Sequence, residues 1–300
     1  MSAERPTIAV FTKNRVNPAY HAARLGAART AEAFGATTVD YVPEVPDDID
    51  EQIALLDQAI RDRPDAVVLV PVHATAVDEA VRRVNAAGIP VINCLNQLSS
   101  PNDYVCFVGS DDYRLAAEVA QRLFEELGGS GDIVILEGAA GSITSRERVR
   151  GFIETARAHP GIHIVESRSG AYLQEPARLA MQAILRDQPK VDGILAANDS
   201  MALGAIEALD EAQRESLVVG ANAIPDAIIA LKNGKLLATA DFDAHKIVGI
   251  ATEATIRVLR GESVPKEIML PVQIVDRTNC DLWDRPLEDR ERPVWDDLVR

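Results

Sequence analysis

Several features are missing from this sequence, and each absence narrows its function. No stretch reaches the roughly 20 apolar residues of a membrane-spanning helix, and residues 1–6 carry neither the basic nor the apolar region of an export signal. Basic residues are also in deficit, with 31 Lys and Arg against 46 Asp and Glu and a formal charge of -15. We therefore expect a soluble chain that binds no nucleic acid.

Metal-binding and disulfide patterns are missing as well. The three cysteines, Cys94, Cys106 and Cys280, are an odd number without CxxC spacing. We expect small buried side chains there, although one pair could still bridge in an oxidising compartment. His159 and His163 are four residues apart, but Pro160-Gly161 between them would break a helix. We expect neither a metal nor a cofactor.

Enzyme motifs are equally absent. The sequence contains no GxSxG elbow, no Walker A loop and no GxGxxG after its first apolar run, and its GAAGS segment lacks the lysine of a phosphate-binding loop. We therefore expect a binding protein and not an enzyme.

What the sequence does contain is a regular alternation of apolar runs and amphipathic stretches. Short, nearly continuous apolar runs separated by helical periodicity are typical of parallel sheets covered on both faces. The expected strands are 7–12, 37–42, 66–71, 90–94, 104–109, 132–136, 163–168, 193–197 and 217–220. The expected helices are 18–34, 48–61, 75–87, 113–127, 145–159, 176–186 and 200–209. The pattern predicts an α/β fold of two doubly wound parallel-sheet lobes.

Residues that directly follow the strands indicate where a ligand would bind, because open parallel sheets bind ligands beyond their carboxyl ends. Most of these residues carry amide, hydroxyl, guanidinium or aromatic groups. Such groups hydrogen-bond hydroxyls and cover C–H surfaces, which suits a neutral polyhydroxylated ligand. The segments are 13–20, 71–73, 95–97, 138–146, 170–172, 198–199, 221–223 and 241–243.

Seven blocks of sequence resemble the type I periplasmic sugar-binding proteins, the ribose-binding proteins among them. The resemblance covers about Pro6 to Val275. In order, the blocks are NPAYHAARLGA, VVLVPVHATAVDEAVRRVNAAGIPVI, FVGSDDYRLA, GAAGSITSRERVRGF, AANDSMALGAIEAL, VVGANAIPDA and LKNGKLLAT.

The resemblance implies two lobes joined by three hinge crossovers, which close around a ligand in the cleft between them. On this basis the N-terminal lobe would comprise 6–109 plus 243–273, and the C-terminal lobe 110–242 plus 274–300. The crossovers would lie near 109–111, 242–243 and 273–274. We expect the tail after Pro271 to pack back on one lobe.

The resemblance also implies site residues. The asparagine of the NP motif, the arginine of the RER block and the asparagine of the ND block contact the sugar in the family. Departures from the family lie at Asn96 and its neighbour Leu95, at Asn222 and at Phe242, where ribose-binding proteins have Asp-Arg, Asp and Gln. A different pentose, a deoxy sugar or a small linear polyol is therefore expected. The full expected set is Lys13, Asn17, Tyr20, Asn96, Arg146, Tyr172, Asn198, Asn222 and Phe242.

Plainer roles exist for some of these residues. Arg146 could form ion pairs in a solvated first helical turn, and Asn198 and Asn222 could be ordinary turn or capping residues. The family resemblance favours the ligand-binding interpretation of all three.

The function implied is that of the substrate-binding component of an ABC-type carbohydrate importer. Its partners would be a small neutral sugar or polyol and a membrane permease. We expect a monomer in the periplasm or outside the cell envelope, with its export signal removed. The alternative is the effector-binding domain of a LacI-type repressor that lacks its DNA-binding headpiece.

Overall fold

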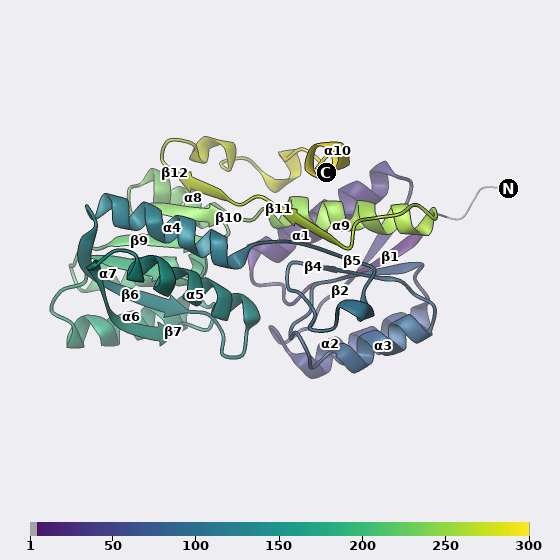
Figure 1. Cartoon of the computed structure of the whole chain (residues 1–300), viewed down its shortest axis with the longest axis horizontal. Coiled ribbons are helices and arrows are strands. Elements are labelled where there is room, and N and C mark those ends of the chain that lie inside the picture. Colours follow the sequence, from purple (N-terminus) through teal and green to yellow (C-terminus); the bar gives the residue numbers. More distant parts are fainter. Residues whose placement is uncertain (1–4, 300) are drawn as a thin grey trace. The chain divides into compact units, whose positions relative to one another are not determined.

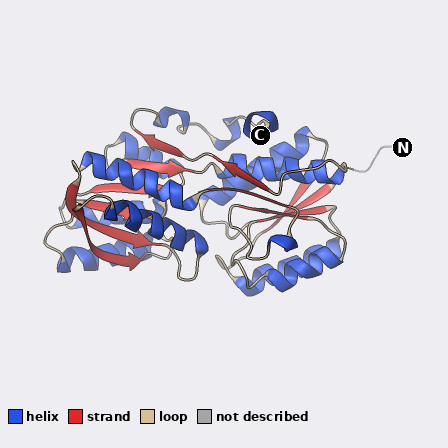
Figure 2. Cartoon of the chain, in the orientation of Figure 1, coloured by secondary structure: helices blue, strands red, loops and turns tan. Residues whose placement is uncertain are grey.

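The computed structural model describes residues 5–299, which fold into two compact α/β units. Unit 1 comprises residues 5–110, 243–270 and 286–299, and unit 2 comprises 111–242 and 271–285. Each unit contains one six-stranded sheet with helices packed against it (Figures 1 and 2).

Unit 1 has a fully parallel sheet of order β11-β5-β4-β3-β1-β2. Its strands are β1 (Thr7–Phe11), β2 (Thr37–Tyr41), β3 (Ala66–Leu69), β4 (Val91–Cys94), β5 (Cys106–Ser110) and β11 (Glu267–Leu270). Its helices are α1 (Pro18–Ala33), α2 (Ile49–Asp62), α3 (Asp78–Ala86), α9 (Ala244–Leu259) and the single turn α10 (Trp295–Leu298), with 3-10 turns at 101–103 and 287–289.

Unit 2 has a sheet of order β12-β10-β9-β8-β6-β7, parallel except for β12. Its strands are β6 (Ser130–Glu137), β7 (Gly161–Ser169), β8 (Gly193–Ala196), β9 (Leu217–Ala221), β10 (Ala238–Asp241) and β12 (Gln273–Asp276). Its helices are α4 (Asp112–Glu126), α5 (Ile143–Arg157), α6 (Gln174–Asp187), α7 (Asp199–Glu211) and α8 (Pro225–Lys232), with a 3-10 turn at 280–282.

The central strands form the core of each unit, as their apolar sequences predict. Every residue of β3, β4 and β8 is buried, because helices cover both faces of each sheet. Polar side chains begin several of the helices: Asp111 caps α4 and Ser142 caps α5, each accepting a backbone N–H of the first turn. The predicted fold of two doubly wound parallel-sheet lobes is confirmed.

The end of the chain departs from the expected lobe assignment. Residues 271–273 group with unit 2, because β12 pairs with β10 from Gln273 onward. Residues 286–299, expected with the second lobe, group instead with unit 1, because Arg292 forms an ion pair with the buried Glu253 of α9. Residue 300 lies outside the described residues. The tail therefore divides between both units, and the chain passes between them four times instead of the expected three.

Between residues 5 and 299, no helix combines the length and the apolar character needed to cross a membrane.

Candidate functional site

Unusual backbone conformations gather just after the carboxyl ends of the strands. Leu95 follows β4, Tyr172 follows β7, Asn222 follows β9 and Asp243 follows β10, and each has a φ between 52° and 114°. Non-glycine residues adopt this left-handed region at a cost of about 1–3 kcal/mol each and do so most often at functional sites. The backbone therefore points to the same sheet edges as the sequence does.

In unit 1, Arg24 contacts the loop that follows β1. Arg24 of α1 donates to Oγ1 of Thr12 at 2.8 Å and forms an ion pair with Asp40 at 3.5 Å. Burial lowers the pKa of Arg24 and raises the pKa of Asp40, with each charge opposing the shift of the other. Lys13, the next residue of the loop, is 6% exposed. Arg24 thus links the start of this loop to α1 and to β2.

The same loop carries two more predicted ligand residues. Asn17 caps α1 by accepting the backbone N–H of Ala19 at 3.0 Å, and its own N–H donates to Oδ1 of Asn14. Tyr20 lies in the first turn of α1 and is half-buried. Asn17 therefore has a structural role in addition to the predicted contact with ligand.

The turn after β4 is shaped by a buried asparagine that the sequence analysis did not single out. The Nδ2 group of Asn93 donates to the carbonyls of Leu69 and Asn96, and its Oδ1 accepts the N–H of Leu98. These three hydrogen bonds hold Asn96 at the carboxyl end of β4. An asparagine inside an otherwise apolar strand is the signal that could have revealed this role.

In unit 2, Arg148 of α5 is the centre of a buried polar cluster. Its Nε donates to Asp112 at 2.8 Å, and its Nη1 donates to the carbonyl of Ala197 at 2.6 Å and to Oδ1 of Asn222 at 3.3 Å. Its guanidinium also lies over the ring of Phe242, 5.5 Å from the ring centre. The cluster therefore joins two predicted site residues, Asn222 and Phe242, to an arginine that was not predicted.

Charge within this cluster is balanced. Burial raises the pKa of the Asp112 carboxyl, and the adjacent Arg148 guanidinium opposes that shift. Because a buried charge is stable only when it is paired and hydrogen-bonded, Asp112 compensates the charge of Arg148 inside unit 2. Arg148 therefore places no uncompensated positive charge at this sheet edge.

Arg146, the arginine that the family resemblance selected, occupies a different position. Its side chain is 69% exposed and forms an ion pair with its neighbour Glu147 at 3.2 Å. Arg148 instead shares the buried face of α5 with Phe152 and Ala156. The spacing of four residues between these three positions is the signal that distinguishes the buried arginine from the exposed one.

Tyr172 and Asn198 lie together at the carboxyl ends of β7 and β8. Asn198 is 1% exposed; its Oδ1 caps α7 through the N–H of Met201, and its Nδ2 donates to the carbonyl of Tyr172. The Tyr172 ring packs on Gly138, where an added Cβ would lie 2.1 Å from Cζ. Burial raises the pKa of Tyr172 to about 12. Contact of these residues, and of the rest of the predicted set, with a ligand stays a prediction.

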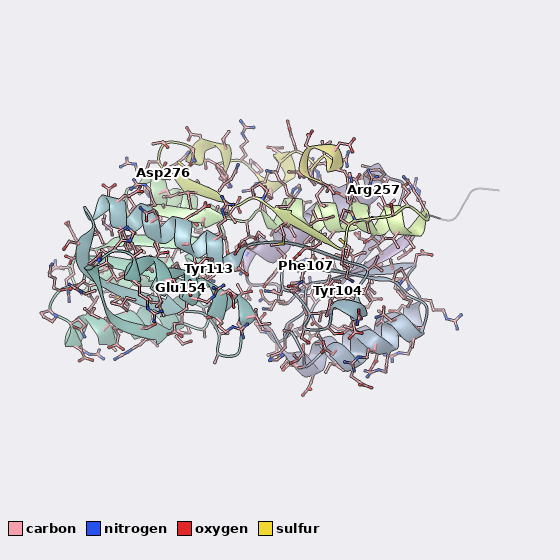
Figure 3. All side chains as sticks on the ribbon, in the orientation of Figure 1. Tyr104, Phe107, Tyr113, Glu154, Arg257 and Asp276 are labelled. Carbon is pink, nitrogen blue, oxygen red and sulfur yellow. The ribbon has the colours of Figure 1, made fainter. Side chains whose placement is uncertain are left out.

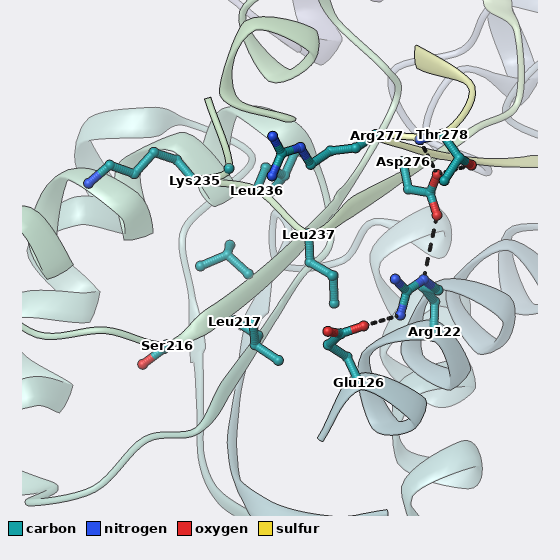
Figure 4. Close-up of a pocket in the computed structure, with 12 residues that line it drawn as sticks. Arg122, Glu126, Ser216, Leu217, Lys235, Leu236, Leu237, Asp276, Arg277 and Thr278 are labelled. Carbon is teal, nitrogen blue, oxygen red and sulfur yellow. Dashed lines mark hydrogen bonds and ion pairs between the residues drawn. The ribbon is translucent and has the colours of Figure 1, made fainter. Parts of the chain in front are cut away.

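A pocket of about 280 Å³ lies elsewhere in unit 2 (Figure 4). It is lined by Leu217 at the start of β9, Leu237 just before β10 and Asp276 at the end of the antiparallel β12. These positions are at the amino-terminal edge of the parallel strands, the edge opposite Asn222. The pocket is therefore separate from the candidate site.

Comparisons with known proteins agree with this geometry. A family model described as periplasmic binding protein domain matches residues 8–263. The chain belongs to this family. The family expected from the seven sequence blocks is thereby confirmed.

Three similar proteins illustrate the range of ligands among relatives. The D-ribose/D-allose-binding protein of Pseudomonas aeruginosa is 30% identical over 287 residues, covering 91% of this chain and 89% of the relative. The xylitol-binding protein of Mycolicibacterium smegmatis is 28% identical over 237 residues, covering 78% and 68%. An ABC transporter periplasmic solute binding protein from Actinobacillus succinogenes, solved with bound D-allose, is 29% identical with a TM-score of 0.89, covering 93% of this chain and 100% of that one. These relatives are binding proteins and not enzymes.

Proposed function

We propose that this chain is the substrate-binding protein of an ABC-type carbohydrate importer and binds a small neutral sugar or polyol by hinge closure between its two units. The observation that carries the proposal is the Arg148–Asp112 pair beside Asn222 and Phe242. Membership of the periplasmic binding protein family and relatives that bind D-allose or xylitol support it.

The neutral character of the ligand is inferred from the charge balance of the Arg148–Asp112 pair in unit 2. A guanidinium that is already paired with Asp112 favours a hydroxyl or ring oxygen over a carboxylate or phosphate, since a second anion would leave the cluster with excess negative charge. The predicted amides, Asn96 and Asn222, donate to and accept from hydroxyls equally well. Sugar acids and sugar phosphates are therefore expected to bind poorly.

The proposed role is to deliver the ligand to a permease, which requires no chemical change of the ligand. The proposal places the chain in the periplasm as a monomer that carries its ligand to a membrane permease and leaves it chemically unchanged. The alternative of a repressor's effector-binding domain gains no support from the relatives described above, which are solute-binding proteins.

A thermal-shift screen tests the proposal. The panel comprises D-ribose, D-allose, D-apiose, xylitol and myo-inositol, with D-ribose 5-phosphate and D-gluconate as charged counterparts. A ligand present at 100 times its dissociation constant adds about 2.7 kcal/mol to the free energy of unfolding. We expect at least one neutral compound to raise the unfolding temperature and the charged pair to leave it unchanged. A shift with only a charged compound would contradict the neutral-ligand proposal.

A further inference from the structure

The C-terminal tail, residues 271–299, lies beyond the part of the chain that the family model matches. Its first part is anchored in unit 2. The β12 strand pairs with β10, and Cys280 is buried in the core of unit 2. Lys232 of α8 forms ion pairs with Asp281, at 3.1 Å, and with Asp284. This part of the tail is therefore built into the unit that contains Arg148.

Trp283 contacts the strand β10, which ends at the candidate site. Its indole Nε1 donates to Oδ2 of Asp241 at 2.6 Å, and Asp241 is 5% exposed. Asp241 is the last residue of β10, and the next residue is Phe242, whose ring lies against Arg148. A hydrogen bond to a buried carboxylate is among the stronger ones in proteins. Trp283 thus holds the strand end that presents Phe242 to Arg148.

The second part of the tail is anchored in unit 1. Arg292 lies over the ring of Phe34 and pairs with Glu253, which is 3% exposed and also pairs with Arg257. Arg257 is on α9 (Figure 3). Its guanidinium lies 4.4 Å from the centre of the Trp295 ring.

The packing of α9 against the tail is close as well. An added Cβ at Gly249 would lie 2.7 Å from Cγ of Pro293. Gly249 therefore leaves room for the tail on α9.

The connection between the two anchors is short. On the unit 2 side, Asp284 pairs with Lys232. On the unit 1 side, residues 287–289 contact α1, and the Arg290 carbonyl accepts from Arg29 at 2.6 Å. Residues 287–289 between them form a 3-10 turn. A chain from 284 to 290 spans at most about 20 Å when fully extended. The tail is therefore a fourth connection between the units with a fixed maximum length.

We propose that residues 271–299 act as a strap that tunes ligand binding: Trp283 positions Phe242 through Asp241, and the short connection after Trp283 limits how far the two units separate. This inference rests on the proposed function, because ligand binding by hinge closure is what the strap regulates. Trp283 is a positioning residue, since it acts through Asp241 and Phe242.

The first test is a double-mutant cycle between Trp283→Phe and Phe242→Leu, read by calorimetric titration. The probe is whichever of D-ribose, D-allose and xylitol gives the largest thermal shift with the wild-type chain. We expect Trp283→Phe alone to raise Kd about threefold to tenfold, and to have no further effect when Phe242→Leu is already present. Equal effects of Trp283→Phe in both backgrounds would overturn the positioning role.

A matched control for this substitution exists in unit 1. The hydroxyl of Tyr41 donates to Oδ2 of Asp62 at 2.7 Å, so Tyr41→Phe also removes an aromatic donor from a carboxylate. We expect Tyr41→Phe to leave Kd unchanged. An equal rise in Kd for both variants would mean that general loss of stability, and not positioning, explains the effect.

The second test lengthens the connection without touching either anchor. Gly-Ser inserts of about 5, 10 and 20 residues after Arg285 are compared with the same inserts after Pro189, an exposed loop position within unit 2. A limiting connection predicts that the radius of gyration of the ligand-free protein, measured by small-angle X-ray scattering, rises with insert length only at the first position. Kd should rise with it, because the binding-competent state becomes less populated.

The scattering measurement needs no ligand, so it separates two kinds of failure. If no compound in the panel binds but the radius of gyration still rises with insert length after Arg285, the proposed function fails and the strap stands. If a sugar binds but neither the radius of gyration nor Kd responds to the inserts after Arg285, the strap is overturned and the proposed function stands.

Discussion

Two arginines in the RER block have opposite surroundings, although only one residue separates them. Arg146 faces solvent beside Glu147, whereas Arg148 is 4% exposed and donates to three acceptors: Asp112 of α4 and two loop residues, Ala197 after β8 and Asn222 after β9. An exposed ion pair contributes about 0–1 kcal/mol to stability. Removing a partner of a buried guanidinium is more destabilising, because it leaves the buried charge uncompensated. The difference lies in the helical face on which each residue falls.

Matched substitutions test which arginine contacts the ligand. Lysine keeps the charge but loses the planar fork of donors. We expect Arg148→Lys to weaken ligand binding by about 1–3 kcal/mol and Arg146→Lys to change it by less than about 0.5 kcal/mol, as measured by calorimetric titration. A larger loss of affinity with Arg146→Lys than with Arg148→Lys would instead identify Arg146, which the family resemblance selected, as the arginine that contacts the ligand.

Asp199 is a second buried charged residue in unit 2. It is 0% exposed, and its carboxylate accepts two hydrogen bonds: one from the hydroxyl of Thr239 at 2.7 Å and one from the backbone N–H of Ile224 at 3.0 Å. Burial raises its pKa from the ordinary 3.8 to about 6, and the hydrogen bonds from Thr239 and Ile224 only partly oppose this shift. The folded protein therefore binds the Asp199 proton more tightly than the unfolded chain does.

This pKa shift predicts a specific pH dependence of stability. The stabilising effect of protonated Asp199 is fully present below about pH 3.8 and is lost as the pH rises through about 6. An Asp199→Asn variant lacks this titration. We expect the free energy of unfolding of the wild type, relative to Asp199→Asn, to fall by on the order of 2 kcal/mol between pH 4 and pH 7 in denaturant titrations. A constant difference across that range would contradict the shift.

At the scale of elements, the sequence predicts most strands and helices because their signals are local. The buried strands β3, β4 and β8 are continuous apolar runs, and α5 and α7 begin at polar caps. A helix boundary differs from the predicted one where a side chain accepts backbone N–H groups of the expected first turn. The helix expected from Thr75 begins at Asp78, because the N–H groups of Thr75 and Ala76 donate to Nδ1 of His73 instead.

The candidate site was predictable in part. Residues such as Asn222 and Phe242 could be chosen because the ends of parallel strands are known ligand-binding positions. The ion pair between Arg148 and Asp112 could not be predicted from the sequence. The two residues are 36 positions apart, and only the packing of α5 on α4 brings them together. Charge compensation of this kind depends on tertiary contacts that no local pattern contains.

Close packing between α1 and α9 gives a prediction at this scale. An added Cβ on Gly26 of α1 would lie 2.1 Å from the carbonyl oxygen of His245 on α9. At an exposed helix position Gly→Ala stabilises by about 1 kcal/mol. The sign of the change in stability therefore shows whether α9 lies close to Gly26. We expect Gly26→Ala to destabilise unit 1 by about 1–3 kcal/mol in denaturant unfolding. Stabilisation would show that the two helices are not in close contact.

At the scale of the whole molecule, the tail is the feature that the sequence analysis placed incorrectly. Residues 286–299 have neither the alternation of a strand nor a long helical period, so their position depends on Arg292, Trp295 and the helix α9 that receives them. Both anchors of the tail are contacts between residues far apart in the sequence. The division of the tail between both units therefore required the structure.

The proposed hinge closure also gives a prediction for the whole chain. If the units close around a ligand, the radius of gyration of the protein decreases when the ligand is added. We expect small-angle X-ray scattering to detect this decrease with the sugar or polyol that gives the largest thermal shift, and no change with D-gluconate. Scattering curves that are identical with and without the bound ligand would contradict closure.

Binding of a neutral carbohydrate is the central claim, and calorimetric titration of the wild-type chain tests it most directly. The titration uses the compound that gives the largest thermal shift, and the recovered ligand is then analysed by mass spectrometry. We predict a saturable heat with one ligand per chain and a ligand of unchanged mass. Absence of heat for every neutral sugar and polyol tested, or recovery of a chemically altered compound, would contradict the account.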